Sequence, residues 1–152
     1  METWLYFGLR LVHILAMAVW IGATVIAPYG FRRTLALGPE HTLPAVDRLL
    51  AATTLIIVAG FTTFLSGAAL IYVMGGVSVM PTRILVGAGL TLGIYLIGGT
   101  ISRPAMTKMR AHFAGGGDVA GAMPFIRTFE ISINVEMALR LAVLVLMVVK
   151  VF

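Results

Sequence analysis

Four long apolar segments restrict what this chain can fold into. A helix needs about 20 mostly apolar residues to cross a bilayer, and the segments that meet this length are 4–28, 49–74, 81–101 and 129–151. Backbone N–H and C=O groups find no water in lipid, so each segment is expected to be helical. We therefore predict an all-α, integral membrane four-helix bundle in which residues 1–152 form a single domain.

The composition fits contact with a lipid bilayer. Of the 152 residues, 60% are hydrophobic and 11% are charged, whereas soluble domains are about 45–50% apolar and about 25% charged. A soluble chain of this size has too little interior to bury such an apolar excess. The chain has no cysteine, which excludes disulfides, thiolate metal sites and cysteine nucleophiles.

Basic residues gather in two of the predicted loops, 29–48 and 102–128. Seven of the 11 Lys and Arg residues are found there, namely Arg32, Arg33, Arg48, Arg103, Lys108, Arg110 and Arg127. The two loops lie on one side of the membrane, and basic loops are retained in the cytoplasm. We expect both termini on the outer side and a short helix near 103–113. The net charge of +5 is explained by basic residues that set the orientation of the spans during membrane insertion. No nucleic-acid partner is therefore expected.

A histidine lies deep in the first span. His13 is about nine residues into the segment, roughly 14 Å from its outer end at 1.5 Å per residue. Arg10, Met17 and Trp20 share its helix face, because the spacing between successive members is three or four residues. Intramembrane ionisable groups are rare and are functional candidates. The imidazole would ligate haem iron or copper, relay a proton, or simply hydrogen-bond to a neighbouring helix.

Two arginines are expected at similar depth near the outer ends of spans one and three. Guanidinium groups of Arg10 and Arg83 would suit an anion such as a pair of haem propionates, because an Arg fork matches a carboxylate. Alternatively, each side chain snorkels, with its stem in hydrocarbon and its head at the interface.

The fourth span contains an acidic and a basic residue one helical turn apart. Glu136 and Arg140 are at i and i+4 and can pair along one face, which Ser132 continues. This pair is either a structural ion pair or an anion anchor and proton path. Asn134 can hydrogen-bond across helices.

The segment 13–33 resembles the first span of a group of small bacterial membrane proteins. It reads His-Ile-Leu-Ala-Met-Ala-Val-Trp-Ile-Gly and ends in Ala-Pro-Tyr-Gly-Phe-Arg-Arg. The HemJ-type protoporphyrinogen oxidase family and the copper-resistance protein D family similarly carry an early histidine followed seven residues later by Trp-x-Gly. The basic linkers and the arginine that opens span three match the oxidase layout, although that family has lysine at the position of Arg83.

The resemblance implies a redox-active protein of the bacterial inner membrane that binds haem b through His13. Arg10, Arg83 and Arg140 would hold propionates, with Met17 and Trp20 nearby. Because this span has one histidine, a second axial ligand would come from His13 of a second copy in a homodimer, or from methionine. Quinone and porphyrin are the expected small-molecule partners. The alternatives are a copper or small-ion transporter that uses His13, Met17 and Glu136, and a cofactor-free subunit of a membrane complex.

Overall fold

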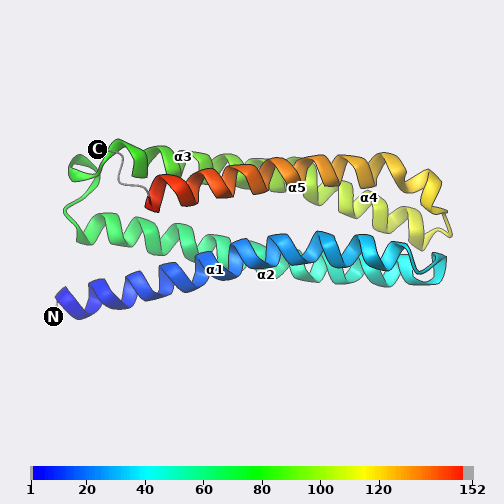
Figure 1. Cartoon of the computed structure of the whole chain (residues 1–152), viewed down its shortest axis with the longest axis horizontal. Helices are drawn as coiled ribbons and strands as arrows, with labels where there is room; N and C mark the ends of the chain where they lie inside the picture. Colours follow the sequence, from blue (N-terminus) through cyan, green and yellow to red (C-terminus); the bar gives the residue numbers. More distant parts are fainter. Residues whose placement is uncertain (1, 149–152) are drawn as a thin grey trace.

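The computed structural model describes residues 2–148, and helices dominate this range (Figure 1). The elements are α1 (Glu2–Leu35), η1 (Pro39–His41), α2 (Thr42–Val73), η2 (Val77–Val79), α3 (Thr82–Ile97), η3 (Gly98–Ser102), α4 (Arg103–Ala114) and α5 (Val119–Val148). The segments α3, η3 and α4 follow one another without a break and form one long helix. Within the described range, four helices are therefore long and apolar enough to span a membrane, as predicted.

The four long helices form two antiparallel hairpins. Helix α1 packs along α2, and the long helix α3–η3–α4 packs along α5. Figure 1 shows the two hairpins as two layers, with the start of α1 and the end of α5 at the same end of the bundle. The turns of 36–41 and 115–118 lie together at the opposite end, as the sequence predicts for the two basic loops.

The helices extend further than the predicted spans. Helices α1 and α2 reach into the segment 29–48, and only residues 36–41 connect them. The predicted short helix near 103–113 is present as α4, but it continues α3 directly. Lys150 and the last residues of the predicted fourth span lie outside the described residues.

Glycines with positive φ end two of the long helices. The chain leaves α2 through Gly75 and Gly76, at φ +108° and +90°, and leaves α4 near Gly116, at φ +79°. A side chain is disfavoured in this region of φ, whereas glycine adopts it without steric cost. These glycines therefore allow the sharp reversals that bring the long helices side by side.

The bundle exterior is apolar, and its interior contains two packed clusters. Large side chains such as Trp4, Leu65 and Leu96 are more than 60% exposed, an arrangement that suits lipid better than water. One cluster fills the end of the bundle near α4 and includes Phe31, Val46, Leu49, Met106, Met109, Phe113, Ile126 and Phe129. The second lies nearer the middle and comprises Trp20, Ala59, Ile94 and Val143. The candidate site lies between these clusters.

Candidate functional site

A π-helical segment interrupts the third long helix beside the middle of α5. Residues Gly98–Ser102 form this segment, η3. π-Helical turns are rare and occur frequently at functional sites. Here the turn buries the side chain of Ser102 against α5. The carboxylate of Glu136 also lies close to Gly98, where an added Cβ would be 3.7 Å from Oε1.

The predicted pair of Glu136 and Arg140 is present and buried. Arg140 Nη2 donates to Glu136 Oε2 at 2.8 Å, and the side chains are 2% and 5% exposed for Arg140 and Glu136 respectively. Ser102 Oγ donates to Glu136 Oε1 at 2.5 Å and lies 2.8 Å from the hydroxyl of Ser132. Both carboxylate oxygens are therefore hydrogen-bonded, which offsets part of the cost of burying the charge.

Arg140 is held on its other side by aromatic rings. Its guanidinium carbon lies 4.9 Å from the ring centroid of Trp20, within the range of a cation–π contact. Trp20 stacks on Tyr95, which in turn stacks on Phe61. Nε and Nη1 of Arg140 and the hydroxyl of Tyr95 are buried and have no hydrogen-bond partner among the described residues.

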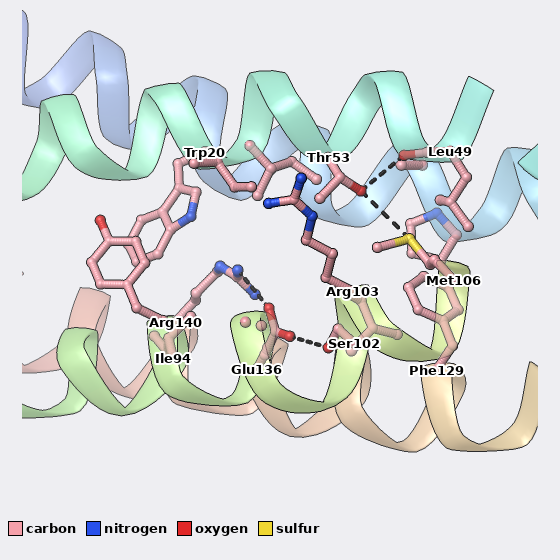
Figure 2. A pocket seen from close by; sticks show the side chains of 18 of the residues that line it. Trp20, Leu49, Thr53, Ile94, Ser102, Arg103, Met106, Phe129, Glu136 and Arg140 are labelled. Carbon is pink, nitrogen blue, oxygen red and sulfur yellow. Dashed lines mark hydrogen bonds and ion pairs between the residues drawn. The ribbon is translucent and has the colours of Figure 1, made fainter. Parts of the chain in front are cut away.

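These groups line a central cavity of about 270 Å³ between the two hairpins (Figure 2). Most of the lining is apolar, with Ile56, Ile57, Ile94, Met106 and Phe129 among its residues. Three charged side chains reach it: Arg103, Glu136 and Arg140. Figure 2 shows the guanidinium groups of Arg103 and Arg140 directed into the same space from different helices. The cavity therefore combines apolar walls with a small set of convergent charged groups, as ligand sites do.

His13 does not line this cavity. It precedes Trp20 by seven residues, which is about 10 Å along α1. Its Nδ1 lies 2.9 Å from the backbone oxygen of Thr63 and 3.1 Å from Ser66 Oγ, both on α2. A carbonyl only accepts, so Nδ1 carries the proton and a neutral ring has its lone pair on Nε2. Among the described residues, no group hydrogen-bonds to Nε2.

The other predicted site residues are spread over the bundle. Arg10 is exposed near the start of α1, and Met17 is half-buried between His13 and Trp20. Arg83 is half-buried at the start of α3, with its Nε buried and without a hydrogen-bond partner in the described range. Asn134 lines a separate hollow at the surface beside Glu130. The predicted residues that the structure brings together are thus Trp20, Glu136 and Arg140.

Sequence reasoning missed three residues of the central cavity. Arg103 was counted among the basic residues of the loop and not among the site residues, although it reaches the cavity. Ser102 and Tyr95 were not singled out, although one hydrogen-bonds to Glu136 and the other stacks on Trp20. The signal for Tyr95 was its polar hydroxyl within an apolar span, whereas Ser102 is brought to Glu136 by the π-turn.

Comparison with protein-family models, curated proteins and solved structures returned no match to this chain.

Proposed function

We propose that the protein is a redox-active membrane protein that binds haem b with His13 as an axial ligand. The observation that carries this proposal is the hydrogen bond from His13 Nδ1 to the Thr63 carbonyl. Metal-ligating histidines usually donate the other ring N–H to a carbonyl or carboxylate, which fixes the tautomer and the ring orientation. The bond to Thr63 leaves Nε2 with its lone pair and without a partner, which is the state that a metal ion requires.

A polar atom without a partner is costly at this depth. His13 lies about 14 Å into the first span, where lipid cannot hydrogen-bond to Nε2. A histidine that only joined two helices would gain nothing from this second nitrogen. A ligand or a second protein chain at Nε2 removes the cost.

The surroundings of His13 favour a haem bound at a surface shared by two copies. The imidazole is half-buried in one chain, and the central cavity lies further along α1. Haem held by His13 would take its other ligand from His13 of a second copy or from a methionine; Met17 follows His13 by one turn on the same helix face and so approaches the iron from the same side. Arg10 and Arg83 are at the same end of the bundle and would hold propionates. Arg140 contacts Trp20 instead, so its role is separate.

Haem would supply one-electron transfer, with its potential set by axial ligation and burial. Quinone reduction and porphyrinogen oxidation are both reactions of this class. The protein's own part is to hold the ring of His13 in place and to keep water away from the cofactor.

The bacterial inner membrane is the proposed location, with both termini outside. The two turns flanked by Arg32, Arg33, Lys108 and Arg110 share one end of the bundle. This arrangement supports a cytoplasmic location for that end under the positive-inside rule.

The absorption spectrum of protein purified from haem-replete cells tests the proposal. We expect a Soret band that is lost in His13→Ala and retained in His41→Ala, since His41 is an exposed histidine at the opposite end of the bundle. Coordination by His13 of two copies predicts one haem per two chains. With a methionine of the same chain as the second ligand, the ratio is one haem per chain.

A colourless protein, or a Soret band that persists in His13→Ala, contradicts haem ligation by His13. Copper binding that depends on His13 and Met17 would favour a copper or small-ion transporter. A protein that purifies only with other subunits and binds neither haem nor copper would favour a cofactor-free subunit of a membrane complex.

A further inference from the structure

The central cavity contains hydrogen-bond donors that the protein itself does not satisfy. The side chain of Arg140 is 2% exposed, yet its Nε and Nη1 have no partner among the described residues. The hydroxyl of Tyr95 is also buried and unpaired there. Buried polar groups are nearly always hydrogen-bonded, and each exception calls for an explanation. The atoms in need of a partner are mostly donors, so the missing group is an acceptor.

The charges that reach the cavity do not cancel. Glu136 compensates the charge of Arg140 through their ion pair. Arg103 also lines the cavity, and within residues 2–148 it has no ion pair or side-chain hydrogen bond. One positive charge is therefore left over at the cavity. A ligand with a single negative charge would balance it.

The cavity is small, apolar and open on one side. Its volume of about 270 Å³ corresponds to roughly nine water molecules at about 30 Å³ each. Exposed residues from α2, η3 and α4 form part of its lining, namely Phe61, Gly99 and Arg103. This opening faces sideways between the hairpins, where a membrane would present lipid. A head group would fit inside while an apolar tail extends into the bilayer.

We infer that the central cavity binds the carboxylate head of a lipid-soluble monocarboxylate, held by Arg103 and Arg140. The planar guanidinium matches a carboxylate in geometry, and one carboxylate balances the one uncompensated charge. A fatty acid of medium length meets these requirements, because it has an apolar body and a single anionic head. The site is independent of His13, which does not line the cavity.

Fluorescence of Trp20 provides a direct readout of this site. The chain has two tryptophans, and Trp4 is 83% exposed, so Trp4→Phe leaves Trp20 as the single reporter. This protein is placed in nanodiscs of phosphatidylcholine and titrated with ionised decanoate or with decanol. We expect a saturable change in Trp20 emission with decanoate and a response about tenfold weaker or less with decanol, which lacks the charge.

Matched variants separate the cavity from general membrane charge. Arg103→Gln is expected to weaken decanoate binding about tenfold or more, whereas Lys108→Gln removes the same charge from an exposed position on the same helix and leaves binding unchanged. Gly99→Leu is expected to narrow the opening and abolish decanoate binding, whereas Gly89→Leu is expected to leave binding unchanged. The two variants are matched, because an added Cβ meets nothing within 4 Å at either glycine. His13→Ala is expected to bind decanoate normally, so the carboxylate site can be confirmed even if His13 does not bind haem.

Three results would overturn the inference. The first is the absence of a saturable response to decanoate, and the second is an equal response to decanol. The third is an equal effect of Arg103→Gln and Lys108→Gln, which would indicate binding to the membrane surface instead of the cavity.

Discussion

The guanidinium of Arg140 lies over the indole of Trp20, with the guanidinium carbon 4.9 Å from the ring centroid. The two residues belong to α5 and α1, helices of different hairpins. This contact therefore joins the two layers at the level of the central cavity. It also positions Arg140 between an aromatic ring and the carboxylate of Glu136.

Breaking the buried ion pair on one side should destabilise the bundle strongly. Glu136→Gln leaves the charge of Arg140 without its counter-ion, and loss of one partner of a buried pair costs about 3–5 kcal/mol. Arg140→Gln is expected to cost a similar amount. Replacing both residues by Gln leaves no buried charge at this pair. The double variant should therefore lose less free energy of unfolding than the sum of the losses in the two single variants.

Unfolding in mixed micelles, followed by circular dichroism as denaturing detergent is added, measures these free energies. Strictly additive losses would show that the two side chains act independently, contrary to the 2.8 Å contact between them.

Gly60 should be intolerant of a side chain. A Cβ at this position would lie 2.9 Å from Trp20 Nε1 and 3.1 Å from the Tyr95 hydroxyl, so Gly60→Ala must displace one of these rings. Overpacking of this kind costs about 1–3 kcal/mol. At Gly89 an added Cβ meets nothing within 4 Å, and Gly89→Ala should be neutral or stabilising by up to about 1 kcal/mol. Thermal unfolding of both variants in the same detergent compares them; equal midpoints would contradict the close approach at Gly60.

Gly67 should control the position of the His13 ring. A Cβ there would lie 3.1 Å from His13 Cε1, so Gly67→Ala pushes the imidazole away and strains its hydrogen bond to Thr63. If haem binds at His13, we expect the variant to retain the cofactor with lower affinity, as titration with haemin followed at the Soret band would show. Gly93→Ala is the control, since an added Cβ has free space there. Unchanged affinity in Gly67→Ala would indicate that the ring does not need its present position.

The orientation can be tested on a background free of native thiols. The chain has no cysteine, so one introduced cysteine gives one labelling site. Ser78 and Ala120 are exposed at opposite ends of the bundle. In intact cells, a membrane-impermeant maleimide should label Ser78→Cys and should label Ala120→Cys only after the cells are opened. The reverse pattern would place the basic turns outside and would refute the orientation that the basic residues predict.

Much of the fold follows from local features of the sequence. Runs of more than 20 apolar residues define the four helices because lipid leaves a backbone no other way to pair its polar groups. The pairing of Glu136 with Arg140 was also predictable, since residues four apart on one helix are neighbours regardless of what surrounds them. The continuity of the third long helix was harder to predict, because the polar residues after position 101 suggested a separate short helix within a loop, whereas the helix continues from α3 to Ala114.

The assembly of the central cavity depended on tertiary structure. Each span is apolar on most of its surface, so periodicity does not reveal which face turns inward. The rotation of each helix comes from packing between helices and, in the third, from the π-turn at Gly98–Ser102. That rotation brought Ser102, Tyr95 and Arg103 to the cavity and left His13 outside it. Apolar length and residue spacing are local properties, so they establish which segments are helical and which charges share a helix. Which of those charges meet depends on how the helices pack against one another.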